Sequence, residues 1–300
     1  VATFQPAFSP DGQVLAYLCN RGEWDQLMVM DLASGKVHEL VGERSLLPPA
    51  WVQGMRTIAW APTSDALYFL DNQEAQTRLH KVALESRQIT PLPLPQFTHI
   101  AQISVSAGGA LAMIAESTDR PPEIWRLQGN AVQLVAANQP NLAGTGWAPL
   151  PQPVSWQSSD GATVYGTYYA PANPECTAEG LPPLIVSVHG GPTSQAAVGF
   201  SLDRLFFTSR GYAFLEVNYR GSTGYGRAYR EALRHRWGPL DMQDTVEGAQ
   251  AMVALGLADP HKLVVKGGSA GGFTVLNALI HYPGFFKAGL CSYGVSNLFT

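Results

Sequence analysis

Residues 1–150 show a repeated pattern in which a turn is followed by a short apolar stretch. The turn-and-strand pairs comprise residues 8–12 with 13–18, residues 60–64 with 65–70, and residues 105–109 with 110–114. Successive pairs are offset by 52 and then 45 residues, and the first and third pairs continue into second strands at residues 27–30 and 123–127. Short strands, turn signals and a period near 45 residues are typical of four-stranded propeller blades. The pattern predicts about three blades; an ordinary β-sandwich with chance internal similarity is the alternative.

A propeller removes exposed sheet edges by closing its blades into a ring, and open edges are a liability for a folded protein. About three blades are too few to close such a ring. We therefore interpret residues 1–150 as C-terminal blades of a partial β-propeller and expect further blades upstream of Val1.

From Pro151 onward the pattern changes. Two strands are predicted around the turn Ser159-Asp160-Gly161, and nearly continuous apolar stretches follow that are typical of strands buried on both faces. The predicted strands are residues 154–156, 164–169, 184–188, 213–219 and 262–266, with a helix at residues 241–255 whose apolar face carries Met242, Val246, Ala249 and Val253. Alternating strands and helices indicate a parallel sheet with crossover helices. Residues 151–300 are therefore predicted to form an α/β-hydrolase domain that is present only in part.

Composition and charge exclude several classes of function. The hydrophobic fraction of 46% against 14% charged residues supports sizeable cores. The net charge is −4, and the 19 Lys and Arg residues are scattered, so a nucleic-acid partner is not expected. No apolar stretch is long enough for a membrane helix and no leader segment is recognised, which favours a cytoplasmic location without membrane attachment. The cysteines are expected to be reduced, buried thiols: Cys19, Cys176 and Cys291.

Residues 267–271, Gly-Gly-Ser-Ala-Gly, fit the Gly-x-Ser-x-Gly pattern of a nucleophile elbow. In a chain with 30 glycines the pattern alone is weak, but its position is specific. It follows the apolar stretch at residues 263–265 and opens an apolar helix at residues 273–280. Glycines are needed where a strained serine sits between a closely passing strand and helix, and the helix dipole acts on the serine oxygen. Ser269 is the predicted nucleophile; a glycine-rich turn without chemistry is the alternative.

The sequence His189-Gly190-Gly191-Pro192 directly follows the apolar stretch at residues 184–188. In α/β-hydrolases, an N–H group from a loop at this place acts together with the N–H of the residue after the nucleophile to bind the oxyanion. The predicted oxyanion donors are therefore Ala270 and either Gly190 or Gly191. His189 precedes the serine in the chain, and we expect it to have a structural role in the loop rather than to act as a general base.

The remaining titratable residues have ordinary structural interpretations. His281 lies twelve residues after Ser269 on the same predicted helix, which places it ~18 Å from the elbow at the helical rise per residue. Asp241 and Asp244 fall in the predicted first turn of a helix, where carboxylates favour the helix dipole, so capping is expected of them. No set of His, Cys or Asp has convincing metal-ligand spacing. The sequence predicts neither a metal nor a cofactor.

Taken in order, several motifs resemble those of one known family. They are the loop at residues 189–192, the segment Asn-Tyr-Arg-Gly-Ser-Thr-Gly-Tyr-Gly at residues 218–226, Trp237-Gly238 with Asp241 and Asp244, and the elbow at residues 267–272. The chain resembles the prolyl oligopeptidase family of serine peptidases, in particular its acylaminoacyl-peptidase and dipeptidyl-aminopeptidase-like branch. The resemblance is close over residues 150–300 and loose before them. It implies a β-propeller that caps the catalytic domain and limits substrates to short peptides, and it implies Gly191 as the oxyanion donor of the loop.

The chain departs from this family in its catalytic triad. The triad order in this fold is Ser, then Asp, then His. After Ser269 the sequence contains no Asp or Glu, and His281 is its only histidine. We therefore expect the acid and the base to lie beyond Thr300.

These observations predict a serine peptidase that hydrolyses short peptides through an acyl-enzyme on Ser269, with water completing the reaction and no cofactor. A carboxylesterase is the alternative enzyme, because the fold and the elbow do not determine the leaving group. A propeller interaction protein whose hydrolase domain has lost its triad is the alternative outside enzymes. The sequence leaves homo-oligomerisation open.

Overall fold

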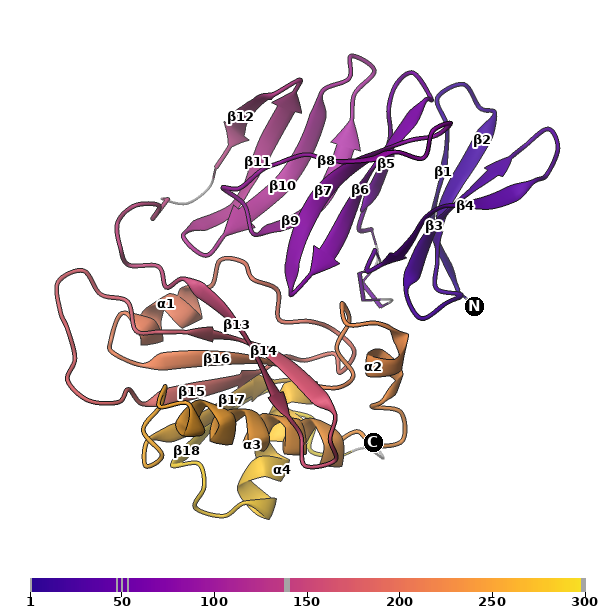
Figure 1. The fold of residues 1–300 in the computed structure, drawn as a ribbon. Helices are drawn as coiled ribbons and strands as arrows, with labels where there is room; N and C mark the ends of the chain where they lie inside the picture. The colour runs from indigo at the N-terminus through magenta and orange to yellow at the C-terminus, as the bar shows by residue number, and fades with distance from the viewer. Residues whose placement is uncertain (1, 47, 50, 53, 138–140, 298–300) are drawn as a thin grey trace. The chain divides into compact units, whose positions relative to one another are not determined.

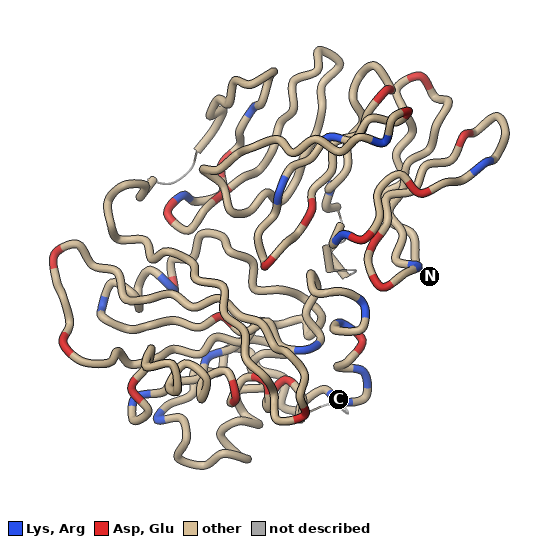
Figure 2. The backbone as a smooth tube through the Cα atoms, in the orientation of Figure 1, with Lys and Arg blue, Asp and Glu red and all other residues tan. Residues whose placement is uncertain are grey.

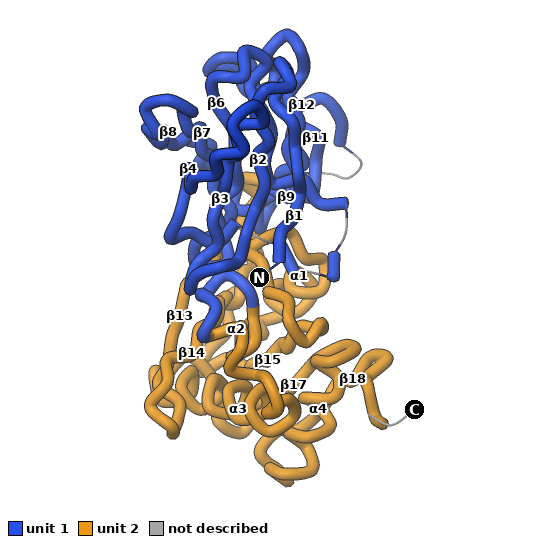
Figure 3. Tube along the Cα trace, turned by 90° about the vertical axis from the view of Figure 1, so that its right-hand side faces the viewer, with its two compact units in different colours: residues 1–141, 223–228 blue, residues 142–222, 229–300 orange. Residues whose placement is uncertain are grey.

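The computed structural model describes residues 2–46, 48–49, 51–52, 54–137 and 141–297. The chain divides into two compact units, drawn in different colours in Figure 3. The first unit contains residues 1–141 together with 223–228, and the second contains residues 142–222 and 229–300. The two units do not share a sheet (Figure 1). Each unit also has hydrophobic clusters of its own.

The first unit contains three sheets of four strands each. The first sheet comprises β1 (Thr3–Phe8), β2 (Val14–Cys19), β3 (Asp25–Asp31) and β4 (Val37–Arg44); the second comprises β5 (Ile58–Trp60), β6 (Ala66–Gln73), β7 (Gln76–Ala83) and β8 (Ile89–Pro91); the third comprises β9 (His99–Val105), β10 (Leu111–Ser117), β11 (Arg120–Gln128) and β12 (Ala131–Ala136). In every sheet each strand pairs antiparallel with the next strand of the chain. The repeated sequence units are therefore repeated four-stranded meanders.

The predicted apolar stretches correspond to β2, β3, β6, β10 and β11, and these strands are confirmed. Strand β7 was not predicted, because its sequence Gln-Thr-Arg-Leu-His-Lys-Val-Ala carries few apolar residues. It still alternates as a strand does: Thr77 and Leu79 are buried on one face, Val82 is buried on the other, and Arg78 is exposed. Leu79 and Val82 accordingly belong to different hydrophobic clusters. Backbone pairing with the neighbouring strands β6 and β8 holds these residues in a strand, although their sequence alone does not indicate one.

Two hydrophobic clusters form the core of the first unit. One includes Leu18, Leu27 and Phe69, and joins residues of the first and second sheets. The other includes Leu79 and Ile103, and joins residues of the second and third sheets. Each sheet therefore buries its apolar residues against its neighbour. Lys and Arg residues are spread along the chain and interspersed with Asp and Glu (Figure 2).

The second unit is built on a six-stranded sheet with the order β13-β14-β16-β15-β17-β18. Its strands are β13 (Pro151–Gln157), β14 (Thr163–Tyr169), β15 (Leu184–Val188), β16 (Ala213–Asn218), β17 (Leu263–Gly268) and β18 (Ala288–Ser292). The last four run parallel to one another, as predicted, whereas β13 and β14 are antiparallel and extend one edge of the sheet.

Helices cover both faces of this sheet. The helices in the part of the chain that the structure describes are α1 (Leu202–Thr208), α2 (Arg227–Glu231), α3 (Pro239–Ala254) and α4 (Ala270–His281). Alternate residues of the parallel strands enter different clusters, because successive side chains point to opposite faces. Val186 and Leu215 pack with Val246 of α3 and Val275 of α4, whereas Ile185 and Phe214 pack with residues including Phe207 of α1. The crossover helices thus shield the central strands from water.

Some sequence expectations need correction at this level. The helix expected at residues 241–255 begins earlier, at Pro239, because a proline suits the first helical position, where no intrahelical N–H donor is needed. Of the expected apolar face, Val246 and Ala249 are buried. The cysteines are free as predicted, but only Cys19 is buried, whereas Cys176 and Cys291 are exposed. Among the described residues, no helix is both long enough and apolar enough to cross a membrane.

Candidate active site

The loops that follow β15 and β17 lie at the same edge of the sheet. The two strands are adjacent and parallel, with Val188 opposite Gly267, so their carboxyl ends meet there. The chain continues from β15 to β16 on one side and from β17 to β18 on the other. Such a reversal of strand order is where open α/β sheets bind their ligands. Topology therefore brings the predicted elbow and the predicted oxyanion loop to one place.

Ser269 occupies the junction between β17 and α4. Its backbone has φ 55° and ψ −121°, a strained conformation for a residue with a side chain. The Ser269 N–H donates to the carbonyl oxygen of Ser292 at 3.1 Å, and its own carbonyl accepts from the N–H of Phe273 at 3.2 Å. The residue is exposed and its hydroxyl makes no helix-capping hydrogen bond. A strained serine with an accessible hydroxyl is the geometry that the elbow pattern predicts.

The glycines around Ser269 allow close approach of backbone to backbone. A Cβ atom on Gly267 would lie 2.4 Å from the carbonyl oxygen of Gly271, and one on Gly271 would lie 2.3 Å from the carbonyl oxygen of Val188. Both distances are far below van der Waals contact, so no larger residue fits at either position without a shift of the backbone. The sequence-based reason for these glycines is confirmed.

The loop at residues 189–192 packs against the elbow. A Cβ atom on Gly190 would lie 3.1 Å from the carbonyl oxygen of Gly268 and 3.4 Å from the Cβ of Ser269. Gly191 has φ +135°, where glycine is favoured, and a Cβ there would lie 2.8 Å from the backbone nitrogen of Thr193. The backbone of the predicted oxyanion loop is therefore in near contact with the predicted nucleophile.

His189 is held by the segment Tyr219–Ser222, which follows β16. Its ring stacks on that of Tyr219 with centroids 4.4 Å apart, and its Nε2 lies 2.8 Å from the Ser222 hydroxyl oxygen. The Tyr219 hydroxyl donates to the carbonyl oxygen of Pro192 at 2.6 Å. Burial lowers the pKa of His189 to about 4, so its ring is neutral at pH 7. These contacts agree with the predicted structural role of His189.

A buried ion pair anchors the same segment to α3. The Arg220 guanidinium donates to both carboxylate oxygens of Asp244, at 2.6 Å from Nη2 and 3.1 Å from Nε, and the Arg220 N–H donates to the same carboxylate at 2.8 Å. Nη1 donates to Asp160 at 2.6 Å and Nη2 to the hydroxyl of Ser158 at 3.0 Å. Although burial opposes the charge, the bonds to Asp244 and Asp160 raise the pKa of Arg220. The sequence indicated this segment only as one of the motifs shared with a known family, and its anchoring role was not predicted.

The two acidic residues of α3 differ from the expectation that both cap the helix. Asp241 does cap it, since it accepts from the N–H of Gly238 at 2.6 Å, and it also accepts from the hydroxyl of Thr274 on α4. Burial raises the pKa of Asp241 to about 6. The capping assignment is wrong for Asp244, which lies beyond the first turn and pairs with Arg220.

The other titratable residues give no support for a second centre. His281 is exposed at the C-terminal end of α4 and lies in its last turn, where a partial positive charge suits the dipole. Within the described ranges, no three His, Cys, Asp or Glu side chains are grouped so that they could hold a metal ion. The described residues thus include the predicted elbow and the predicted oxyanion loop, and the sequence after Ser269 contains no Asp or Glu.

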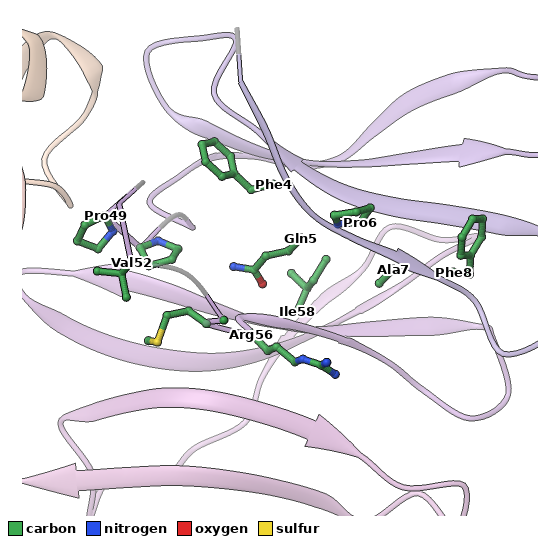
Figure 4. Close-up of a pocket in the computed structure, with 12 residues that line it drawn as sticks. Phe4, Gln5, Pro6, Ala7, Phe8, Pro49, Val52, Arg56 and Ile58 are labelled. Atoms are coloured by element: carbon green, nitrogen blue, oxygen red, sulfur yellow. The ribbon is translucent and has the colours of Figure 1, made fainter.

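Pockets away from the predicted site are also found among the described residues, and two of them are considered in turn. One, of about 690 Å³, lies in the first unit and is lined by residues of β1 and by residues 48–49, 52, 54–56 and 58; Phe4, Gln5 and Arg56 are among them (Figure 4). The other, of about 780 Å³, lies in the second unit near the starts of β15 and β16, and its lining includes Tyr168 and Cys176. Neither pocket contains a predicted site residue.

Known proteins that are similar to this chain include members of one peptidase family. Residues 198–300 match the model described as the prolyl oligopeptidase family. The chain is 32% identical over 196 residues to dipeptidyl aminopeptidase BIII of Pseudoxanthomonas mexicana, and 26% identical over 303 residues to dipeptidyl-peptidase 5 of Porphyromonas gingivalis. The resemblance to the prolyl oligopeptidase family is therefore confirmed.

Solved structures extend the likeness to nearly the whole chain. A puromycin-hydrolysing peptidase of Mycobacterium tuberculosis superposes with a TM-score of 0.90 at 32% identity, covering 99% of this chain and 45% of that one. A puromycin hydrolase gives a TM-score of 0.89 at 32% identity, over 98% of this chain and 44% of that one. This chain covers 28% of the length of dipeptidyl aminopeptidase BIII and 42% of the length of dipeptidyl-peptidase 5. The chain thus spans less than half the length of the proteins it matches.

Proposed function

We propose that the protein to which this chain belongs is a serine peptidase that hydrolyses short peptides through an acyl-enzyme on Ser269. The observation that carries the proposal is the strained, exposed Ser269 at the carboxyl edge of the sheet, in near contact with the backbone of Gly190. Relatives with the same architecture are named as peptidases. A serine so placed attacks a carbonyl carbon when a base takes its proton.

In this proposal the backbone amides of Ala270 and Gly191 bind the oxyanion of the tetrahedral intermediate. Ala270 is the first residue of α4, so its N–H is one of the amides left without an intrahelical partner at a helix start. Gly191 lies on the loop whose backbone packs against the elbow. Two preorganised donors aimed at developing negative charge are the main source of catalysis in acyl transfer.

We further propose that residues 1–150 are blades of a β-propeller and that residues 151–300 are the nucleophile half of an α/β-hydrolase domain. The three consecutive four-stranded meanders and the six-stranded sheet with helices on both faces support this division. The triad acid and base are assigned to residues outside this sequence, because no Asp or Glu follows Ser269. The chain covers less than half the length of each of the two solved structures, which fits that assignment.

The relatives named for puromycin hydrolysis suggest the first substrates to examine. In puromycin an amino acid is attached to a nucleoside through an amide bond. The test therefore measures how fast the whole protein hydrolyses aminoacyl anilides, puromycin and an ester matched to the anilide. Turnover of the amides by wild type, with Ser269 as the site of labelling by a fluorophosphonate, is the expected result. Hydrolysis of the ester alone would replace the peptidase by a carboxylesterase. A whole protein that turns over none of them and takes up no label would contradict both.

A further inference from the structure

The pocket of about 690 Å³ in the first unit is lined in part by an irregular stretch of β1. The register of β1 on β2 shifts between Phe4 and Ala7, where β1 has one residue more than its partner. Such a β-bulge changes the direction in which a side chain points. Within it Gln5 has φ 50°, a left-handed conformation that residues with a side chain rarely adopt. Backbone strain of this kind is concentrated at binding sites, which makes the pocket a candidate for one.

Hydrogen bonds fasten this part of the pocket to all three sheets of the first unit. The Gln5 side-chain oxygen Oε1 accepts from the N–H of Thr57 at 2.8 Å and from its hydroxyl at 3.3 Å. Thr57 directly precedes β5 of the second sheet. The carbonyl oxygen of the neighbouring Arg56 accepts from a backbone N–H of β9, in the third sheet, at 3.0 Å. The backbone around Gln5 and Arg56 is therefore held in place before any ligand binds.

Two hydrogen-bond donors in the lining have no partner among the described residues. A backbone N–H can only donate, so the bond from Thr57 identifies the bonded Gln5 atom as the oxygen and leaves the amide nitrogen Nε2 without a partner. The second donor is the guanidinium of the exposed Arg56, which forms no ion pair with a described residue. Figure 4 shows the two groups in different parts of the pocket. A ligand that satisfies both must therefore carry two separate acceptor groups.

The rest of the lining is apolar. Apart from Gly54, the other described residues of the lining are Phe, Pro, Ala, Val, Met and Ile. They include Phe8, whose side chain is 65% exposed, and the half-buried Phe4 and Val52. No Asp or Glu is among the described lining residues, so a cation would have no counter-charge there. Pockets of about this volume with apolar walls and a few placed polar groups are typical sites for small ligands.

We propose that this pocket binds the carboxyl-terminal end of a short peptide with an apolar last residue. The terminal carboxylate pairs with Arg56, whose planar guanidinium matches a carboxylate with two parallel hydrogen bonds. The Gln5 amide nitrogen donates to a carbonyl oxygen of the peptide backbone, and the apolar side chain packs against the apolar lining. A fatty acid has a carboxylate and an apolar group but no second acceptor for Gln5. The choice of a peptide also rests on the proposed function, because a peptidase encounters short peptides as substrates and as products.

The test is isothermal titration of the whole protein carrying Ser269→Ala, so that binding is measured without turnover. For Gly-Gly-Leu we expect a Kd of about 0.1–1 mM, as is usual for a ligand of this size. Gly-Gly-Leu amide lacks the charged carboxylate and should bind about tenfold more weakly. Gly-Gly-Gly lacks the apolar side chain and should also bind about tenfold more weakly. Octanoate, which offers nothing to Gln5, should bind more weakly than Gly-Gly-Leu.

Variants of the two donors assign the binding to this pocket. Arg56→Gln should lower the affinity for Gly-Gly-Leu about tenfold but leave the affinity for the amide unchanged, because the variant and the amide remove the same ion pair. Gln5→Glu keeps an oxygen for the Thr57 N–H and replaces the amide donor by a negative charge. It should weaken the binding of Gly-Gly-Leu about tenfold, since the carbonyl loses its donor and the carboxylate is repelled.

Matched controls make the same changes of charge elsewhere in the first unit. Arg126→Gln on β11 and Gln133→Glu on β12 alter exposed residues that do not line the pocket. Exposed charges outside the pocket are largely screened by salt, so each control should change the affinity less than about twofold. Should Gln5→Glu not fold, Arg56→Gln still decides the question, because Arg56 is exposed and its side chain holds no other described residue.

The outcomes distinguish this inference from the proposed function. Absence of binding at about 1 mM Gly-Gly-Leu, or an equal loss for the acid and the amide in Arg56→Gln, would overturn the pocket as a peptide site. Octanoate binding more tightly than Gly-Gly-Leu would overturn the peptide as its occupant. Labelling of wild type at Ser269 by the fluorophosphonate without any of the expected binding leaves the proposed function standing and refutes only this inference. The expected binding without labelling refutes the proposed function and supports the pocket.

Discussion

Two buried aspartates, one in each unit, differ in how completely they are paired. Asp244 in the second unit is fully buried and both its oxygens accept from Arg220. Asp71 in the first unit is also buried and accepts from Arg44 and Gln73 through Oδ2, but its Oδ1 has no partner among the described residues. The nearby His80 has the same deficiency at both ring nitrogens, and its Nε2 is 3.8 Å from Asp71.

The difference shows what a buried charge contributes in each place. A fully paired cluster has only one low-energy arrangement, and around Asp244 that arrangement holds the segment that supports the loop beside Ser269. A partly paired cluster retains the cost of desolvation without the compensating bonds. In this chain, the complete network therefore lies beside the proposed chemistry and the incomplete one lies in a sheet of the first unit.

The largest expected effect is on the chemistry of the second unit. Ser269→Ala in the whole protein should lower kcat for peptide substrates by about 10⁴- to 10⁶-fold, because the nucleophile is removed while the binding surface stays. Steady-state kinetics together with circular dichroism measures this, and a Ser34→Ala variant in the first unit is the control for expression and purity. More than about a tenth of wild-type activity in a pure sample would overturn the assignment of Ser269.

The next effect compares the two aspartates directly. Asp244→Ala removes the bidentate partner of the buried Arg220 and leaves the exposed Asp160 as its carboxylate partner, so it should lower the free energy of unfolding of the second unit by about 3 kcal/mol. Asp71→Ala should cost the first unit only about 1–2 kcal/mol, because Arg44 is partly exposed and reaches water. Denaturant titration followed by fluorescence measures both. Equal losses would show that completeness of pairing is not what separates the two clusters.

A smaller effect is expected at the oxyanion loop. Gly191→Val places a branched side chain at φ +135°, where its Cβ would meet the Thr193 nitrogen, so the loop must shift away from Ser269. We expect kcat to fall about 10²-fold with a smaller change in KM, because the donor acts mainly in the transition state. Gly211→Val, at another positive φ but in open space, is the control for backbone strain alone. A rise in KM with kcat unchanged would move the loop from catalysis to ground-state binding.

The smallest effect tests the incomplete cluster. His80→Phe keeps the stacking on Phe69 and removes two unpaired nitrogens, so stability at pH 7 should change by less than about 1 kcal/mol. Burial lowers the pKa of His80 below 6.5, so the unfolded chain binds its proton more readily than the folded chain. Wild type should therefore lose stability as the pH falls below 6.5, and the variant should lose less. Thermal unfolding between about pH 7.5 and about pH 5, the range in which an unperturbed histidine changes its charge, measures the difference. Parallel curves for the two proteins would contradict this origin.

The local pattern of apolar residues and glycines predicted the elements whose own residues are enough to determine their structure. The stretch at residues 184–188 is β15 with the same bounds, since a run of apolar residues has few alternatives to a strand buried on both faces. The elbow at Ser269 was predicted for the same kind of reason, because only closely spaced glycines allow a strand and a helix to meet at the distances observed for Gly267 and Gly271. Strand β7 escaped prediction, because its polar sequence becomes a strand only between two neighbours.

By itself, the sequence determined the repeated meanders, the parallel strands, the elbow at Ser269 and the loop at residues 189–192, because spacing along the chain is enough for each of them. Only the tertiary structure decided that Asp244 pairs with Arg220 instead of capping α3, and that Ser222 meets His189 thirty-three residues away. These contacts depend on the order of strands in the sheet, in which β15 lies between β16 and β17. Strand order is set by the packing of helices on the two faces, a property of the whole unit that no local stretch of residues contains.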